Sequence, residues 1–140
     1  MVLMFQKEVA ERIAASPGTK DYGSLSVLSQ VYTDVRLEFD LGPHLFVPRP
    51  KVTSSVVSLR VLDGPRVEVC DEAFFRSVVR AAFSTRRKML PNALKTIGFE
   101  REEAFRALSQ AGIDPQRRGE TLSIEEFSSL ASVLYALKQG

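Results

Sequence analysis

The chain has 140 residues, of which 44% are hydrophobic and 26% are charged, and its formal net charge at pH 7 is +2. These values are typical of a globular protein and exclude a disordered chain, a collagen-like repeat and a disulfide scaffold. The single cysteine, Cys70, has no partner for an internal disulfide, and the sequence has no Cys/His cluster that would predict a zinc site. The apolar opening MVLMF is too short for a signal peptide, and no other stretch reaches the length of a membrane span. We therefore expect a cytoplasmic protein with no membrane partner.

The first third of the chain predicts part of an α/β sheet. Met1–Phe5 is a continuous apolar run, which is typical of a strand buried on both faces, and residues 7–15 have the apolar spacing of a helix. A second helix is expected over Ser24–Tyr32. The alternation in VRLEFDL predicts a strand over Val35–Leu41 with one face in water, and another alternating run predicts a strand over Val52–Leu62.

The first predicted strand also predicts an exposed sheet edge. A central-type strand at the start of a chain has no neighbour on one side, and an uncovered edge can pair with a second chain. We therefore expect that a neighbour of Met1–Phe5 is missing from this chain, and that the chain self-associates through this strand.

After Asp63-Gly64-Pro65 the pattern predicts helices only. The expected organisation is thus a sheet domain over residues 1–64, with three strands and two helices, and a small all-helical domain over residues 65–140. A buried stripe is predicted on the first helix of the second domain, made of Phe74, Phe75, Val78, Val79 and Ala82.

Local signals predict the ends of the later helices. Pro91 is acceptable in the first turn of a short helix that Gly98 ends, and a further helix is expected over Glu102–Ala111. Ser123 and Glu126 have the spacing of a capping box at the start of the last helix.

Residues for acid-base or nucleophilic catalysis are sparse. His44, the only histidine, lies next to a proline in a connecting segment, where a solvent-exposed or capping role is more common than catalysis. Nucleotide cofactors usually need a glycine-rich turn after the first strand, because small residues let backbone amides approach the ligand. The eight glycines are scattered singly and form no G-x-G pair, so we expect no cofactor bound to this chain.

One part of the sequence is markedly basic. Between Ala73 and Phe99 there is no acidic residue, and there are six basic ones: Arg76, Arg80, Arg86, Arg87, Lys88 and Lys95. Cations near the C-terminus of a helix complement its dipole, but that explanation covers two of the six. Neutralisation of nucleic-acid phosphates uses the whole set, so the pattern favours nucleic-acid binding.

The segment FVPRPKV, residues 46–52, combines an aromatic ring with two prolines and two cations. The prolines restrict the backbone, so Phe46 is expected to be held in place as a stacking platform for a base, with Arg49 and Lys51 beside it for flanking phosphates. The alternative is that Phe46 plugs the end of the sheet, and composition favours neither interpretation.

Five blocks resemble, in the same order, the C-terminal part of the KsgA-type small-subunit ribosomal RNA adenine N6-dimethyltransferases: MVLMFQKEVAERI, YGSLSVLSQ, FVPRPKVTSSVVSL, RAAFSTRRKMLPNAL and GIDPQRRGETLSIEEFSSLASVL. The resemblance implies the C-terminal part of a Rossmann-like methyltransferase sheet followed by a helical domain that docks the 30S particle. It implies S-adenosylmethionine as the cofactor of the intact parent and small-subunit rRNA as the substrate. It also implies that Phe46 lies beside a flipped target adenine, and that the last strand lies between the two before it.

The chain departs from the family pattern in one respect that decides activity. The glycine-rich cofactor loop, the acidic residue that holds the ribose and the N-L-P-Y motif of the family all belong upstream of Met1. We therefore expect this chain to be a truncated, inactive fragment of an enzyme that dimethylates two adjacent adenines near the 3′ end of small-subunit rRNA. The alternative is a non-catalytic RNA-binding or ribosome-assembly module that acts through the basic helical domain.

Overall fold

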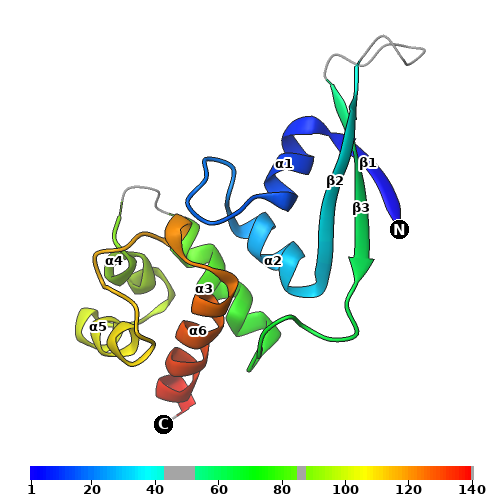
Figure 1. Cartoon of the computed structure of the whole chain (residues 1–140). Helices are drawn as coiled ribbons and strands as arrows, with labels where there is room; N and C mark the ends of the chain where they lie inside the picture. Colours follow the sequence, from blue (N-terminus) through cyan, green and yellow to red (C-terminus); the bar gives the residue numbers. More distant parts are fainter. Residues whose placement is uncertain (43–52, 85–87, 140) are drawn as a thin grey trace. The chain divides into compact units, whose positions relative to one another are not determined.

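The computed structural model describes residues 1–42, 53–84 and 88–139, and its described part falls into two compact units. One unit contains residues 1–16 and 21–66, and the other contains residues 17–20 and 67–140. Figure 1 shows strands and helices in the first unit, and helices without strands in the second. Each unit is described below by itself.

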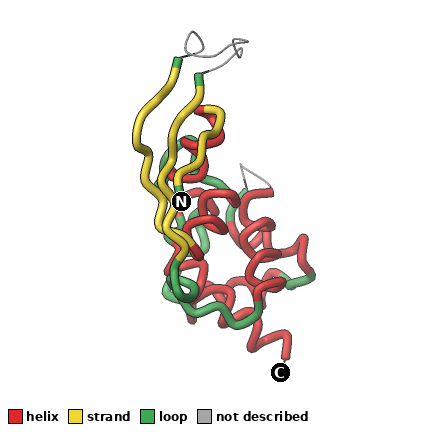
Figure 2. Tube along the Cα trace, turned by 90° about the vertical axis from the view of Figure 1, so that its right-hand side faces the viewer, coloured by secondary structure: helices red, strands yellow, loops and turns green. Residues whose placement is uncertain are grey.

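The first unit is a three-stranded sheet with two helices. Its elements are β1 (Val2–Gln6), α1 (Lys7–Ala14), α2 (Ser24–Tyr32), β2 (Thr33–Leu41) and β3 (Ser54–Val61). The strand order is β1-β3-β2, and both outer strands run antiparallel to β3. The expected position of the last strand, between the two before it, is therefore confirmed. Figure 2 shows the three strands running side by side.

Only one face of this sheet is covered by helices within the first unit. Val57 of β3 is fully buried, whereas Val2 and Met4 of β1 are 67% and 54% exposed. Figure 1 shows α1 and α2 on the same side of the strands. The prediction of a first strand buried on both faces is therefore wrong for the described chain, in which β1 is an edge strand of the sheet.

The prediction that the alternating apolar residues of β2 share one face of the strand is also wrong, because a bulge interrupts the strand. Leu37 pairs with Val57, but Phe39 pairs with Val56, the next residue along β3, and the register shifts between them. Adjacent residues of a strand point to opposite faces, so Leu37 and Phe39 do not share the single apolar face that their alternation indicates. Phe39 instead lies on the open face and is 58% exposed.

The second unit contains helices and, among its described residues, no strand. Its elements are α3 (Glu72–Ser84), α4 (Leu90–Leu94), the 3-10 helix η2 (Lys95–Ile97), α5 (Arg101–Gln110), the 3-10 helix η3 (Gly119–Thr121) and α6 (Ile124–Gln139). The predicted apolar stripe of α3 is confirmed, since all five of its members are buried. Among the described residues, no helix is long and apolar enough to cross a membrane.

Two of the predicted helix-end signals are present as hydrogen bonds or backbone geometry. The backbone N–H of Glu126 donates to Ser123 Oγ at 3.1 Å, and the backbone N–H of Ser123 donates to Glu126 Oε1 at 3.0 Å, which confirms the capping box. Gly98 follows η2 with a φ of +95°, a conformation that favours glycine, so its role as a helix stop is confirmed.

Gly119 lets η3 pack directly against the backbone of α3. A Cβ at this position would lie 2.5 Å from the carbonyl oxygen of Ala82 and 2.9 Å from its Cβ. The segment between α5 and α6 is further held by Arg117, whose guanidinium donates to both carboxylate oxygens of Glu126. The first contact holds η3 against α3, and the second holds the same segment to α6.

Candidate nucleic-acid interface

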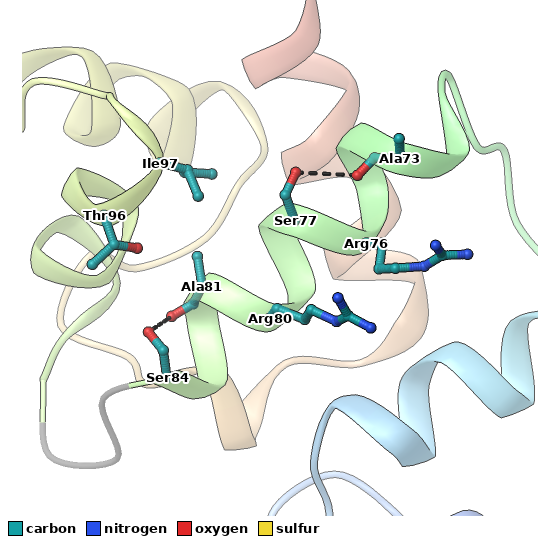
Figure 3. Close-up of a pocket in the computed structure, with 8 residues that line it drawn as sticks. All are labelled: Ala73, Arg76, Ser77, Arg80, Ala81, Ser84, Thr96 and Ile97. Atoms are coloured by element: carbon teal, nitrogen blue, oxygen red, sulfur yellow. Dashed lines mark hydrogen bonds between the residues drawn. The ribbon is translucent and has the colours of Figure 1, made fainter.

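Arg76 and Arg80 lie one turn apart on the exposed side of α3. The spacing of the helix explains their placement, because Phe75 and Val79 take the neighbouring positions in the core and leave the arginines outside. In Figure 3 the two side chains extend from α3 in the same direction, away from Thr96 and Ile97. Two guanidinium groups on one helix face can therefore contact successive phosphates of one strand.

A shallow groove of about 680 Å³ runs along this part of the helical unit. Its walls come from α3 and η2, and its lining residues are Ala73, Arg76, Ser77, Arg80, Ala81, Ser84, Thr96 and Ile97. The groove therefore combines two cations with hydroxyl groups and small apolar side chains. Such a surface suits a sugar-phosphate backbone better than a compact apolar ligand.

The hydroxyl groups of the groove donate to backbone carbonyl oxygens three or four residues earlier in the chain. Ser77 Oγ donates to the carbonyl oxygens of Ala73 and Phe74, at 3.1 and 2.9 Å. Ser84 Oγ donates to Ala81 O at 2.7 Å, and Thr96 Oγ1 donates to Ala93 O at 2.7 Å. Because each hydroxyl proton is used internally, the oxygens are left to accept hydrogen bonds, for which a ribose 2′-hydroxyl is a suitable donor.

In the described part of the chain, neither arginine of the groove forms an ion pair. Other arginines do: Arg12 pairs with Glu8, Arg60 and Arg66 pair with Asp34, and Arg117 pairs with Glu126. The positive charge of Arg76 and Arg80 is therefore available to a ligand.

The remaining predicted site residues are only partly described. Lys95 is exposed and begins η2, next to Thr96 of the groove, so the structure brings it to the same helical segment as one groove wall. Lys88 is exposed and precedes α4, and it is not among the groove-lining residues. The other predicted residues lie outside the described ranges: His44, Phe46, Arg49, Lys51, Arg86 and Arg87.

The connection that carries Phe46 begins and ends at a polar cluster. It joins β2 to β3, and Leu41 and Ser54 at its two ends are paired across the sheet. Asp40 accepts a hydrogen bond from Ser55 Oγ at 2.6 Å and lies 3.2 Å from Lys7 Nζ. The hydrogen bond from Ser55, and then that from Lys7, lower the pKa of Asp40 below its usual value of 3.8. The cluster therefore ties together the strands on either side of the connection.

The described residues do not fit a nucleotide cofactor. β1 ends at Gln6 and α1 begins at Lys7, so no glycine-rich turn separates this strand from the helix that follows it. Across residues 1–42, 53–84 and 88–139, no group of three or more His, Cys, Asp or Glu side chains could hold a metal ion. No catalytic step is therefore assigned to the described residues.

Sequence reasoning missed the hydroxyl groups of the groove and the Asp40 cluster. Ser77 and Thr96 are ordinary surface residues in the sequence, and only the packing of η2 beside α3 brings them together. The interaction of Asp40 with Ser55 follows from strand pairing across the connection, which the single sequence does not specify.

Residues 1–135 match the protein family described as "Ribosomal RNA adenine dimethylase". A relative from Caldanaerobacter subterraneus subsp. tengcongensis, named "Ribosomal RNA small subunit methyltransferase A", is 54% identical over 137 residues, which cover 98% of this chain and 51% of the relative. A relative of the same name from Geobacter metallireducens is 52% identical over 139 residues, which cover 98% and 50%. The chain thus spans about half the length of the curated relatives it matches.

Two solved structures are similar in fold. The crystal structure of a dimethyladenosine transferase from Plasmodium falciparum superposes with a TM-score of 0.73 at 24% identity and covers 99% of this chain and 56% of that one. The crystal structure of the 23S rRNA methyltransferase ErmE gives a TM-score of 0.62 at 23% identity, with coverage of 96% and 54%. At these identities the likeness concerns the fold, and it confirms the predicted combination of a partial methyltransferase sheet with a helical unit.

Proposed function

Because the chain belongs to the ribosomal RNA adenine dimethylase family, we propose that its parent protein transfers methyl groups to N6 of two adjacent adenines near the 3′ end of small-subunit rRNA. The names of the relatives from Caldanaerobacter and Geobacter support the small subunit as the substrate. S-adenosylmethionine is the proposed methyl donor of the parent, and the cytoplasm its proposed location. The chain of 140 residues by itself is proposed not to methylate, since it has no G-x-G pair and its described residues do not fit a nucleotide cofactor.

The role proposed for this chain is to hold the RNA substrate. The observation that carries this proposal is the groove of the helical unit, in which Arg76 and Arg80 are exposed, share one helix face and form no ion pair with the described residues. Each arginine neutralises one phosphate, and Lys95 adds charge beside the groove wall. Arg86, Arg87 and Lys88 lie between α3 and α4 in the sequence and extend the same positive segment.

Phe46 is proposed to stack on a target adenine that has been turned out of the RNA. Extraction of a base costs a few kcal/mol, and an aromatic side chain replaces part of the lost stacking. The cluster of Asp40, Ser55 and Lys7 at the base of the connection supports this role, because it fixes the strands from which the connection starts. Arg49 and Lys51 are proposed to bind the flanking phosphates.

A second function is favoured by the position of the groove. The groove is lined entirely by residues of the helical unit, so it needs nothing from the sheet unit in order to bind RNA. The chain by itself is therefore also a candidate for a non-catalytic module that binds 30S particles during assembly.

Binding of the chain to 30S particles at several salt concentrations tests the proposed role. Arg76→Ala with Arg80→Ala should weaken binding and reduce the slope of log affinity against log salt by about 1.5, because two phosphate contacts are lost. Arg36→Ala with Arg106→Ala is a matched control, since it removes the same two positive charges from exposed sites on β2 and α5. If the double variant and the wild type have equal affinity and equal salt dependence, the groove does not bind the RNA of the 30S particle.

A further inference from the structure

A second, smaller pocket lies in the helical unit, apart from the groove of Arg76 and Arg80. It has a volume of about 190 Å³ and is formed by the start of α4, one side of α5 and the connection at Pro115 and Gln116. Its apolar lining includes Met89 and Phe105, which are 42% and 38% exposed although both are large hydrophobic side chains. Exposed apolar groups around a concave site indicate a ligand surface.

One side of this pocket is a stacked pair of side chains. Arg101 and Phe105 are four residues apart on α5, and the guanidinium carbon of Arg101 lies 5.3 Å from the centre of the Phe105 ring. The arrangement is a cation–π contact that presents a flat surface with a positive charge. In the part of the chain that the structure describes, Arg101 forms no ion pair that would neutralise this charge.

Two carboxamide groups complete the pocket. Asn92 lies on α4 and Gln116 on the connection, and within residues 88–139 neither side chain forms a hydrogen bond. A carboxamide has a donor beside an acceptor, which matches the edge of a nucleobase, and Asn or Gln can bind adenine in this way. The lining contains no carboxylate, so the pocket is not suited to an amine or a metal cation.

The walls of the pocket are fixed before any ligand binds. The backbone N–H of Leu90 donates to Arg117 O at 3.1 Å, which ties the connection to the start of α4. The backbone N–H of Gln116 donates to Asp114 Oδ1 at 2.9 Å, and Arg117 is held by Glu126. A preformed site loses less conformational entropy on binding than one that must be ordered by its ligand.

We propose that this pocket binds one unpaired base of the RNA, stacked on Arg101 and Phe105 and recognised at its edge by Asn92 and Gln116. Unstacked bases are commonly held on aromatic rings or guanidinium planes and hydrogen-bonded along their edges. A purine is the expected base, because its larger face covers more of the stacked pair. The inference rests on the proposed function, since it assumes that the ligand of the helical unit is RNA.

The test uses the whole chain and two short oligouridine strands of equal length, one with a central 2-aminopurine and one with a central abasic site. The two strands have equal phosphate charge, so the difference in affinity measures the base alone. The aminopurine strand should bind about tenfold more tightly, and its fluorescence should fall on binding because the base stacks. Phe105→Leu keeps an apolar side chain and should remove most of this tenfold preference, because it weakens binding of the aminopurine strand more than binding of the abasic strand. Asn92→Ala should reduce the preference in the same direction.

The outcomes separate this inference from the proposed function. Equal affinity for the two strands, or a preference that survives Phe105→Leu, would refute the base pocket even if Arg76→Ala with Arg80→Ala weakens both strands and the RNA-binding role stands. Failure of the chain to bind either strand or 30S particles would refute both. Binding of a proline-rich apolar peptide that is lost in Phe105→Leu, with no preference for the aminopurine strand, would overturn the inference and assign the pocket to a protein partner.

Discussion

Ser55 Oγ donates a hydrogen bond of 2.6 Å to the carboxylate of Asp40, and the two residues pair across the strands that lead into and out of the connection carrying Phe46. Lys7 reaches the same carboxylate from the first turn of α1 at 3.2 Å, and its backbone N–H donates to Thr53 O at 2.9 Å. Three separate elements therefore meet at the base of this connection. Their contacts tie together the end of β2, the start of β3 and the start of α1.

Asp40 should make stability depend on pH in the acid range. Its pKa is lowered in the folded chain, so the charged form is favoured by folding, and the resulting stabilisation is fully present above the usual pKa of 3.8, which applies to the unfolded chain. It is lost as the pH falls through the lower folded pKa. Urea unfolding of wild type and Asp40→Asn between pH 2.5 and 7 should show a difference that shrinks below about pH 4. A difference that stays constant over this range would contradict the assignment.

Gly119→Ala should destabilise the helical unit by about 1–3 kcal/mol, because the added methyl group meets the backbone of Ala82 and forces α3 and η3 apart. Gly64→Ala is the matched control, since a Cβ at that position meets nothing within 4 Å. Thermal and urea unfolding of both variants provide the comparison. If Gly119→Ala is as stable as Gly64→Ala, the close approach of η3 to α3 is wrong.

RNA should bind the groove more tightly than DNA of the same sequence. The oxygens of Ser77 and Thr96 are left as acceptors, and only RNA offers the 2′-hydroxyl donor. Ser77→Ala with Thr96→Val should therefore narrow the difference between RNA and DNA while the salt dependence stays the same, because the arginines are intact. Arg76→Ala should lower the affinities for RNA and DNA by the same factor and should reduce the salt dependence of both. If the ratio of RNA affinity to DNA affinity is unchanged in Ser77→Ala with Thr96→Val, these hydroxyl groups do not contact the RNA.

Phe46→Ala in the full-length parent should lower methyl transfer and leave 30S binding nearly unchanged, because the ring is proposed to act on the extracted base and not on the RNA backbone. Base stacking on an aromatic ring contributes about 1–3 kcal/mol, so the rate should fall about 5- to 150-fold. Phe46→Tyr keeps an aromatic face and should keep most of the activity. Equal rates for the alanine variant and the wild type would favour the alternative that Phe46 plugs the end of the sheet.

The chain should self-associate through the edge strand β1. Sedimentation velocity at rising concentration should show dimers or larger species, and Val2→Lys should reduce them because a charged edge resists pairing. Leu25→Lys is the control, since Leu25 is an exposed apolar residue, 45% accessible, but lies on α2 and not on a strand edge. A monomer at all concentrations would rule out this association.

Helices were predictable from the sequence because their signals are local. The bounds of α2 match the expected Ser24–Tyr32, and the capping box at Ser123 and the stop at Gly98 lie where their residue types indicate. Which residues of a strand point to the covered face was less predictable, because the bulge after Leu37 depends on pairing with β3. The buried side of α2 is likewise formed by Val27 and Val31, while Leu25 is 45% exposed, since packing and not spacing alone decides the inner face.

The candidate site also combines residues that were predictable from local sequence with residues that only the packing brings together. Arg76 and Arg80 were predictable because one helical turn separates them, whereas the opposite wall at Thr96 and Ile97 depends on how η2 packs. The Arg101–Phe105 pair has the i, i+4 spacing of a helix contact and could have been found from the sequence once α5 was assigned. The role of Phe46 remains a prediction, as do those of Arg49, Lys51, Arg86 and Arg87.

The β2 bulge has a consequence for how the chain behaves in solution. The bulge turns Phe39 outward, so that Met4, Val56 and Phe39 form one apolar row across the three strands. This row lies on the face of the sheet that α1 and α2 leave uncovered. Both end members of the row are more than half accessible to solvent. An exposed apolar row of this kind should bind hydrophobic dyes and promote aggregation when the chain is warmed. Low protein concentration or detergent should reduce this aggregation even while every helix is folded.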